Sequence, residues 1–312
     1  MKLFVAILLV FVFTLEAKVV TRMKVMMGTF ATVKLEKQDK RHFKNVYKTL
    51  KRVENSLSSY DPISPIYRLN HNKKAKINLY TYEALSFSEK YYKQSNGYFN
   101  IAIGSITKDL YRFGEEERIP KSKELKKSLT TFSTLAFDEN IAEIGKGIKI
   151  DLGGMGKGYG VDRAIEYLKI NGISRGSVAL SGDIRCLDRC KIEVNNPFDN
   201  KPLVYFYTKY PDMGVSTSGN YNRYVKEKKH NHLINPKTKK SGLTFTSITL
   251  ISTLPNSDLD AYATAASVMP RREAYKFLDS LELAYIILEE NMSFHMSKNL
   301  SEYISLKKDT SE

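Results

Sequence analysis

The 312-residue chain has no stretch rich in proline, glycine or serine that would serve as a linker, and it has no internal repeat. Domains of one chain are usually joined by exposed, flexible linkers of that composition. With 42% hydrophobic residues, the chain is long enough to build one large core. We therefore predict a single folded domain over residues 18–312, preceded by a short N-terminal segment.

Cysteine is scarce: the chain has Cys186 and Cys190, both in the segment CLDRC, and no others. Two thiols lack the third and fourth ligands of a closed zinc site, so a metal centre of that kind is not expected. The pair predicts either a small disulfide loop or two free thiols, and a disulfide would suit an exported protein. Because no cysteine lies near residue 17, a lipid-modified N-terminus is not supported.

The uncharged segment LFVAILLVFVFTL, residues 3–15, is too short to span a bilayer comfortably. Lys2 precedes it, and Ala17 ends the LEA that follows, with Leu15 two positions earlier, as at a secretory cleavage site. We therefore predict that residues 1–17 are a signal peptide and that the protein is exported to the periplasm. The alternatives are an uncleaved anchor in the inner membrane and a buried N-terminal strand.

The formal net charge is +15, from 49 lysines and arginines against 34 aspartates and glutamates. Such an excess is found in proteins that bind nucleic acid or anionic membranes. Here the lysines are spread along the chain, and there is no arginine-rich arm or recognition motif. We therefore predict a solvated, lysine-rich surface and no nucleic-acid partner. Attraction to an anionic lipid or ligand is the alternative.

Helical periodicity occurs over residues 39–57, about 81–96, 161–171, 257–269 and from Pro270 onward. Alternating or β-branched segments occur between these, most clearly in LTFTSITLIS and in a closing hairpin LAYIILEENMSFHMS. The proline-interrupted SSYDPISPIYRLN, residues 58–70, is predicted to be a loop. Hairpins mixed with a few helices predict an α+β fold of largely antiparallel sheets with flanking helices.

The segment DLGGMGKGYGVDRA, residues 151–164, has five glycines and Lys157 within eight positions. It is not a P-loop, because Asp151 stands where the first glycine belongs, and it does not fit G-x-G-x-x-G, because Tyr159 holds the third position. A tight loop, a lysine and a helix N-terminus together suit an anion such as a phosphate. A purely structural glycine turn is the alternative.

Asp260 and Thr264 are four residues apart in a predicted helix and therefore share a face. Carboxylate and hydroxyl oxygens are ligands that Mg²⁺ accepts, although Asp and Thr near a helix start often cap it instead. His230 and His232 stand in the segment KEKKHNHLINPKT, and neither has a carboxylate next to it in the sequence. A single histidine that acts as an acid, a base or a phosphate contact is therefore favoured over a metal pair.

Eight segments together resemble the FAD:protein FMN transferases (the ApbE family), in their order and spacing. The segments are MGTFATV, SSYDPISPIYRLN, NGYFNIAIGSI, DLGGMGKGYGVD, LSGDIR, STSGNYNRY, HLINPKT and LDAYATA. They cover roughly residues 20–300. The resemblance implies a periplasmic or membrane-facing transferase that binds FAD and Mg²⁺. It would move FMN onto a Thr or Ser hydroxyl of a target flavoprotein, for example a subunit of a membrane redox complex, and would release AMP.

The resemblance also implies roles for individual residues. Met27, Tyr60, Tyr98, Phe99 and Asn100 would contact FAD, Asp151 would hold a polar group of FAD, and Lys157 would lie near its pyrophosphate. The carbonyl of Gly154, with Asp260 and Thr264, would hold Mg²⁺, and His232 is implicated in transfer. Asn100 and Asn235 stand where the family commonly has aspartate.

Two rival functions fit the same residues. A FAD pyrophosphatase would use water in place of the protein hydroxyl and would release FMN and AMP. A non-catalytic exported flavin-binding protein would keep the pocket and lose the metal pair. Because Asp260 and Thr264 are both present, the binding protein is disfavoured. The same pocket serves a transferase and a pyrophosphatase, and it is the family resemblance that favours the transferase.

Overall fold

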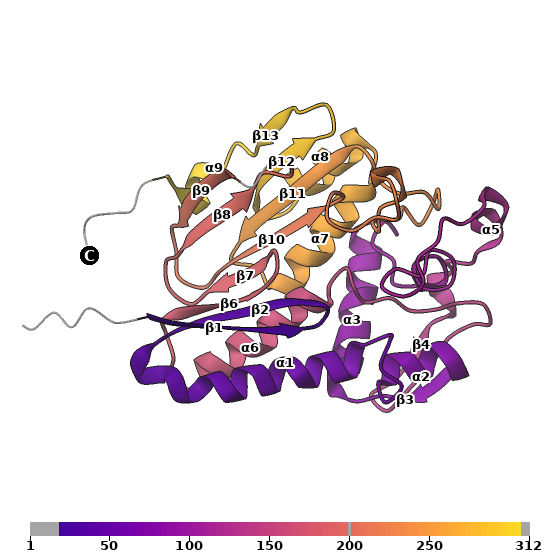
Figure 1. Cartoon of the computed structure of the whole chain (residues 1–312), viewed down its shortest axis with the longest axis horizontal. Coiled ribbons are helices and arrows are strands. Elements are labelled where there is room, and N and C mark those ends of the chain that lie inside the picture. The colour runs from indigo at the N-terminus through magenta and orange to yellow at the C-terminus, as the bar shows by residue number, and fades with distance from the viewer. Residues whose placement is uncertain (1–18, 199–200, 307–312) are drawn as a thin grey trace, which may run out of the picture.

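The structure is a computed structural model that describes residues 19–198 and 201–306 (Figure 1). The predicted signal peptide, residues 1–17, lies outside the described part of the chain. Within that part, none of the helices combines the length and the apolar composition needed to cross a membrane.

An antiparallel sheet of eight strands forms the centre of the fold, in the order β1-β2-β6-β7-β10-β11-β12-β13. The strands are β1 (Val19–Met26), β2 (Thr29–Glu36), β6 (Gly176–Leu180), β7 (Asp183–Cys186), β10 (Met213–Gly219), β11 (Phe245–Ser252), β12 (Ala284–Glu289) and β13 (Phe294–Met296). Strand β1 forms one edge of this sheet and pairs only with β2 along the described chain.

Two smaller sheets accompany the large one, with the orders β14-β9-β8 and β3-β5-β4. Their strands are β8 (Lys191–Asn195), β9 (Pro202–Thr208), β14 (Ile304–Ser305), β3 (Lys74–Lys76), β4 (Ala136–Phe137) and β5 (Ile141–Glu143). Neighbouring strands in all three sheets are antiparallel, which confirms the predicted α+β class.

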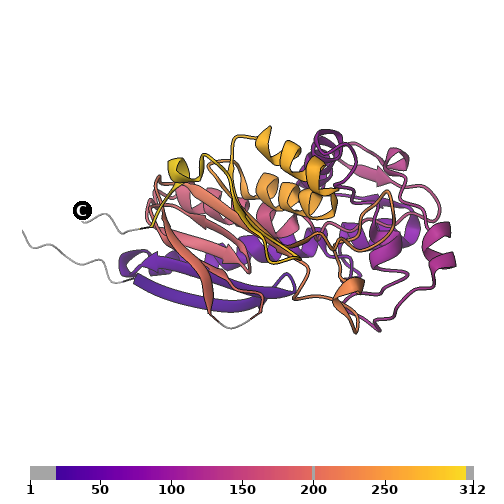
Figure 2. The same cartoon turned by 90° about the horizontal axis from the view of Figure 1, so that it is seen from above.

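The helices are α1 (Phe43–Leu57), α2 (Pro65–Asn72), α3 (Leu79–Gln94), α4 (Gly104–Thr107), α5 (Ser122–Lys127), α6 (Gly156–Ile170), α7 (Asn256–Val268), α8 (Arg271–Asp279) and α9 (Leu300–Tyr303). Helices α1, α6 and α7 lie behind the large sheet in Figure 1, and Figure 2 shows them on one side of it. The smaller sheet of β8 and β9 lies on the opposite side.

Each face of the large sheet has its own core. Ala31, Val33 and Leu35 alternate along β2 toward α1 and α6, and all three are fully buried. On the other face, Phe206 of β9 packs with residues of β7, β10, β11 and β12. That cover does not extend to β1, whose outward side chains remain exposed.

The predicted loop over residues 58–70 is partly wrong, because α2 begins at Pro65. Ser64 caps this helix by accepting a hydrogen bond from the amide of Ile66, and Pro65 takes the first helical position, where a missing N–H costs nothing. Proline there starts a helix rather than interrupting one. Of the two alternatives for the cysteines, the structure has the disulfide, between Cys186 and Cys190.

Candidate active site

The glycine stretch brings α6 into direct contact with α7. A Cβ on Gly158 would lie 2.2 Å from the backbone oxygen of Asn256, the first residue of α7, so only glycine fits there. The Gly158 amide donates a hydrogen bond of 3.1 Å to Oδ2 of Asp260. The first turn of α6 is thereby held against the carboxylate that we predicted to be a metal ligand.

Lys157 lies between two buried carboxylates. Its Nζ is 3.1 Å from Oδ2 of Asp183 and 3.1 Å from Oδ2 of Asp260. Burial disfavours the ammonium charge, but attraction to these two groups outweighs it and holds the pKa of Lys157 above its ordinary value. Two carboxylates therefore share one monovalent cation.

Asp183, at the start of β7, is only 1% exposed. Its Oδ1 accepts a hydrogen bond from the Ser216 hydroxyl, whereas its Oδ2 accepts none and faces Lys157. Burial, reinforced by the negative charge of Asp260, raises the pKa of Asp183 above the ordinary value for aspartate. A divalent cation beside this cluster would relieve both the desolvation and the repulsion.

A carbonyl and a hydroxyl lie beside the same carboxylates. The Thr264 hydroxyl donates a hydrogen bond of 3.2 Å to the carbonyl of Gly154, and Thr264 is one helical turn after Asp260. A Cβ on Gly154 would approach Cγ2 of Thr264 to 2.9 Å, so glycine allows this contact. Oxygen ligands of this kind, completed by waters and substrate phosphates, suit Mg²⁺.

Among the described residues, no group of three or more His, Cys, Asp or Glu side chains is arranged to hold a metal ion. A magnesium ion here would therefore depend on the neutral oxygens of Gly154 and Thr264 as well as on Asp260. Oδ2 of Asp183 accepts no hydrogen bond and is balanced by the Lys157 ammonium, so a buried pair of carboxylates already holds one cation here, and their chemistry fits such an ion.

Asp151, at the end of the segment that leads into the glycine stretch, is held by donors and cations. Its Oδ2 accepts a hydrogen bond of 2.6 Å from Thr107 and lies 3.4 Å from Nζ of Lys108, and its Oδ1 accepts from the amide of Gly153. Burial opposes ionisation, but these partners and the charge of Arg223 outweigh it and lower the pKa of Asp151 to about 2. Asp151 is therefore an anion, with its oxygens already bound by the protein.

Tyr60 extends this cluster to the surface. Its hydroxyl donates to the carbonyl of Phe113 at 2.7 Å and accepts from Lys108 at 2.6 Å and Arg223 at 3.3 Å. The Lys108 ammonium is 4.2 Å from the centroid of the Tyr60 ring, and Tyr60 is 43% exposed. An exposed aromatic face beside two cations suits a planar ligand that carries phosphates.

His232 lies near the same charges. Its Nδ1 is 3.1 Å from the carbonyl oxygen of Arg223. Because a carbonyl oxygen can only accept, Nδ1 carries the proton in this contact and Nε2 keeps its lone pair. Burial, together with the positive charges of Arg223 and Lys157, lowers the pKa of His232 to about 4. The ring is therefore neutral at pH 7 and presents a proton acceptor.

We expect a histidine signal that titrates near pH 4 in a proton–carbon NMR spectrum, assigned by its loss in His232→Asn. Arg223→Gln should move this pKa upward, because it removes a nearby positive charge and leaves the carbonyl in place. Lys228→Gln, which removes an exposed lysine from the same region, should leave it unchanged. A His232 signal that titrates at the ordinary value for histidine would contradict the described environment.

The aromatic residues predicted to contact FAD are largely buried. Tyr98 and Phe99 are 7% and 3% exposed. The Phe99 ring packs edge-on against Tyr91, and its Cε2 lies 3.4 Å from the position a Cβ on Gly154 would take. The Lys237 ammonium is 3.8 Å from the Tyr98 ring centroid. Phe99 therefore lies against Gly154, and contact of Tyr98 or Phe99 with FAD stays a prediction.

Asn100 uses its side-chain amide within the protein. Its Nδ2 donates to the carbonyl of Thr130 and its Oδ1 accepts from the amide of Ala102, both at 2.9 Å. The amide of Asn235 donates in the same way to the carbonyl of Val268 at 2.6 Å. An ionised aspartate could not donate to either carbonyl. These hydrogen bonds therefore give a structural reason for asparagine at both positions.

Met27 occupies the turn between β1 and β2. Its amide donates a hydrogen bond of 2.7 Å to Glu54, and its sulfur lies 3.1 Å from the position a Cβ on Gly160 would take. The turn therefore rests on α6, one helical turn after Lys157. Contact between Met27 and FAD also stays a prediction.

Four residues of this site are absent from the predicted set: Thr107, Lys108, Asp183 and Arg223. Asp183 lies in the motif LSGDIR and Arg223 in STSGNYNRY, so both residues could have been found from the motifs themselves. Thr107 and Lys108 follow the motif NGYFNIAIGSI and carry no pattern of their own.

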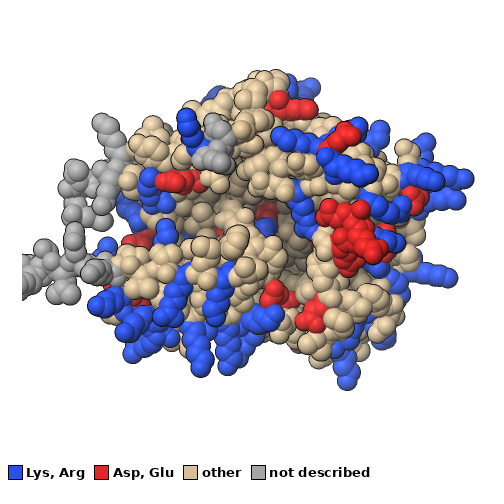
Figure 3. Space-filling view, in the orientation of Figure 1, with Lys and Arg blue, Asp and Glu red and all other residues tan. Residues whose placement is uncertain are grey.

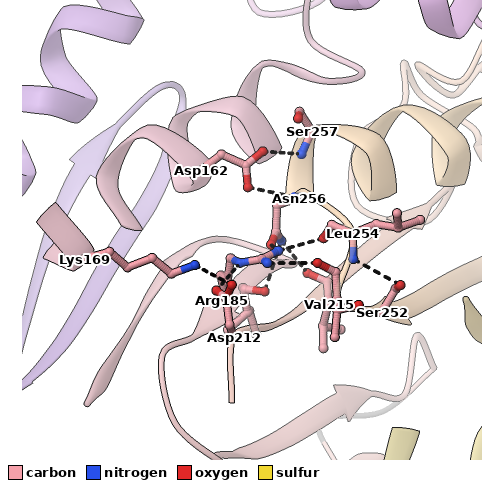
Figure 4. A network of polar contacts seen from close by, with 11 residues as sticks. Asp162, Lys169, Arg185, Asp212, Val215, Ser252, Leu254, Asn256 and Ser257 are labelled. Carbon is pink, nitrogen blue, oxygen red and sulfur yellow. Dashed lines mark hydrogen bonds and ion pairs between the residues drawn. The ribbon is translucent and has the colours of Figure 1, made fainter. Parts of the chain in front are cut away.

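A polar network fixes the N-terminus of α7, which carries Asp260 and Thr264 (Figure 4). Asp162 of α6 accepts hydrogen bonds from the amides of Asn256 and Ser257, both at 2.8 Å. This cross-helix carboxylate caps α7, which has no side-chain cap of its own.

Arg185 of β7 holds the loop just before α7. Its guanidinium donates to the carbonyls of Leu254 at 2.7 Å and Thr253 at 3.0 Å and pairs with Asp212 at 2.8 Å. The residue is 6% exposed. Asp162 of α6 and Arg185 of β7 together fix the start of α7, and so they position Asp260 and Thr264, the candidate metal ligands.

Replacing Asp162 by alanine should lower the free energy of unfolding by about 2 kcal/mol, because two buried amide donors lose their charged acceptor. Urea denaturation measures this change. Glu166→Ala, which removes a half-exposed carboxylate from the same helix, should change it by less than about 0.5 kcal/mol. Equal effects of the two variants would contradict the capping role.

Solved structures share this fold. An ApbE protein from Thermotoga maritima aligns with a TM-score of 0.84 at 22% identity, over 93% of this chain and 100% of that one. The flavin transferase ApbE from Vibrio cholerae aligns with a TM-score of 0.79 at 21% identity, over 92% and 99% of the two chains. At these identities the likeness establishes the fold.

Sequence comparison gives the family. A FAD:protein FMN transferase of Klebsiella pneumoniae (strain 342) is 25% identical over 225 residues, which are 69% of this chain and 71% of that protein. The ApbE family model matches residues 27–287. The chain therefore belongs to the ApbE family.

Proposed function

We propose that this protein is a magnesium-dependent FAD:protein FMN transferase. It would cleave the pyrophosphate of FAD, move FMN onto a Thr or Ser hydroxyl of a target flavoprotein and release AMP. Family membership and the name of the Klebsiella pneumoniae relative support the transfer. The observation that carries the chemistry is the cluster of Lys157, Asp183 and Asp260 beside the oxygens of Gly154 and Thr264.

In this proposal the Gly154 carbonyl, the Thr264 hydroxyl and the Asp260 carboxylate hold Mg²⁺. When bound, magnesium neutralises the negative charge that builds on the pyrophosphate oxygens during cleavage. The Asp260 carboxylate is oriented for this task by the Gly158 amide. Lys157 exchanges one of its carboxylate contacts for a phosphate oxygen of FAD.

In the transfer itself, the acceptor hydroxyl oxygen forms a bond to the phosphorus on the FMN side of the pyrophosphate. The bond from that phosphorus to the bridging oxygen breaks, and AMP leaves with this oxygen. Nε2 of His232 accepts the hydroxyl proton, because its lone pair is free and its ring is neutral at pH 7. Arg223 and Lys108 add positive charge where the anionic substrate enters.

The chain from Lys18 onward, FAD and Mg²⁺ should be incubated with and without a Thr-containing acceptor domain, and the acceptor weighed by intact mass spectrometry. An added FMN mass that EDTA abolishes would support the transferase. Free FMN and AMP with an unmodified acceptor would favour the pyrophosphatase. Intact FAD throughout would leave a flavin-binding protein.

The proposal includes export to the periplasm, with residues 1–17 removed as a signal peptide. The mass of the protein recovered from cells tests this directly. A chain that begins at Lys18 agrees with cleavage, and a full-length chain in the membrane fraction would indicate an anchor.

A further inference from the structure

The outer face of the β1–β2 hairpin is apolar and uncovered. Val19, Met23, Val25 and Phe30 are 60%, 60%, 73% and 60% exposed. The register pairs Val25 with Phe30, and Met23 lies two residues from Val25, so these side chains share one face. The large sheet is buried by α1 and α6 on its other side, so the exposed face has no structural task in the described fold.

A dense row of cations borders this face. Residues 19–57 contain ten lysines and arginines, all exposed, whereas none of their three carboxylates is exposed. The cations are Arg22, Lys24, Lys34, Lys37, Lys40, Arg41, Lys44, Lys48, Lys51 and Arg52. Lys51 forms an ion pair with Glu54 at 2.8 Å. None of the other nine cations forms an ion pair with a carboxylate of the described residues.

The apolar face and the cations adjoin. Arg22 and Lys24 extend from β1 over the rings of Phe43 and Tyr47 in α1, at 4.6 Å and 4.7 Å from the ring centroids. Figure 3 shows the resulting row of basic side chains below an uncharged area on the face toward the viewer. Acidic side chains gather elsewhere on this face, beyond a central hollow.

In the sequence, the hairpin begins just after the predicted signal peptide, and its turn lies next to the candidate active site. The apolar segment of residues 3–15 ends shortly before Val19, the first residue of β1. At its far end, the turn at Met27 rests on α6 beside Gly160, in the helix whose second residue is Lys157. A surface that receives this hairpin would therefore lie close to the candidate active site.

We propose that the β1–β2 hairpin and the cations of residues 37–52 form a docking surface for an anionic phospholipid bilayer. Exposed apolar side chains enter the boundary between headgroups and acyl chains, and lysines and arginines around them are attracted to anionic headgroups. A scattered lysine-rich surface would carry exposed carboxylates among its cations, and this one carries none over residues 19–57. The inference does not depend on the flavin chemistry.

Sedimentation with vesicles tests the proposal on the chain from Lys18 onward, which retains every described helix and strand. Vesicles of phosphatidylcholine with phosphatidylglycerol should pellet the protein at low salt, vesicles of phosphatidylcholine alone should not, and added salt should release it. Lys40→Glu, Lys44→Glu and Lys48→Glu combined should weaken binding about a hundredfold. Met23→Thr with Val25→Thr should also weaken it, since both side chains point outward.

Matched controls separate this surface from net charge. The triple variant Lys123→Glu, Lys126→Glu, Lys127→Glu changes the charge equally in and around α5 and should bind vesicles as the unchanged protein does. Ile170→Thr removes an apolar side chain that is 78% exposed elsewhere and should also have no effect.

Three results would overturn the proposal: equal binding to neutral vesicles, equal losses in the Lys40/Lys44/Lys48 and α5 triple variants, or no binding to either vesicle. Analytical ultracentrifugation without lipid tests whether a second copy of the chain covers the apolar face instead. A dimer that disappears in Met23→Thr with Val25→Thr would assign the face to a second copy of the chain instead.

Discussion

Asp260→Ala is expected to abolish FAD turnover, by at least about a thousandfold, while FAD binding falls only in part. The variant removes the one charged ligand from the group formed with Gly154 and Thr264, and with it the charge neutralisation of the pyrophosphate. The residues around Tyr60 and Asp151 that favour flavin and phosphate binding are left in place. AMP release measures turnover, and flavin fluorescence measures binding.

Asp258→Asn is the matched control on the same helix. Asp258 is also buried, but it faces away from the site, pairing with Lys90 at 2.8 Å and accepting from Tyr91 at 2.6 Å. This variant should reduce stability and keep turnover within about threefold. Full activity in Asp260→Ala would remove the metal assignment. Lys157→Ala should lower turnover less severely than Asp260→Ala.

Helices and strands with strong periodicity were predictable from the sequence. The helical spacing predicted over residues 39–57 and 257–269 and the predicted strand LTFTSITLIS correspond to α1, α7 and β11, although Lys37–His42 form a separate 3-10 helix before α1. Each of these elements buries a regular set of side chains, so local pattern and tertiary packing agree. The loop prediction over residues 58–70 was wrong where Ser64 and Pro65 begin a helix, because capping outweighed the usual effect of proline.

From residue spacing alone, without the family resemblance, the site was predictable only where it lies within one element. Asp260 and Thr264 share a face of α7, so their spacing was sufficient to place them together. Asp183 reaches Lys157 because β7 pairs in the sheet in front of α6, and Lys108 reaches Asp151 from the residue that follows the short helix α4. Contacts between elements far apart in the chain depend on strand order and register, which a single sequence does not specify.

His232→Asn is expected to lower FMN transfer by about 10²–10⁴-fold and to leave FAD binding nearly unchanged. The asparagine amide can still donate to the Arg223 carbonyl from the position of Nδ1, but it offers no proton acceptor in place of Nε2. Transfer is measured as FMN mass on the acceptor. His230→Asn is the control two residues away, because the His230 ring faces Tyr111 instead, and it should transfer normally.

The same variant separates the two steps of the chemistry. If His232 only takes the proton of the acceptor hydroxyl, His232→Asn should retain whatever slow FAD cleavage the protein shows without acceptor, whereas Asp260→Ala should lose both reactions. Loss of both reactions in His232→Asn would place the histidine on the pyrophosphate itself. Normal transfer in His232→Asn would assign the proton to a carboxylate of the cluster, with Asp183 as the candidate, because burial and the negative charge of Asp260 raise its pKa.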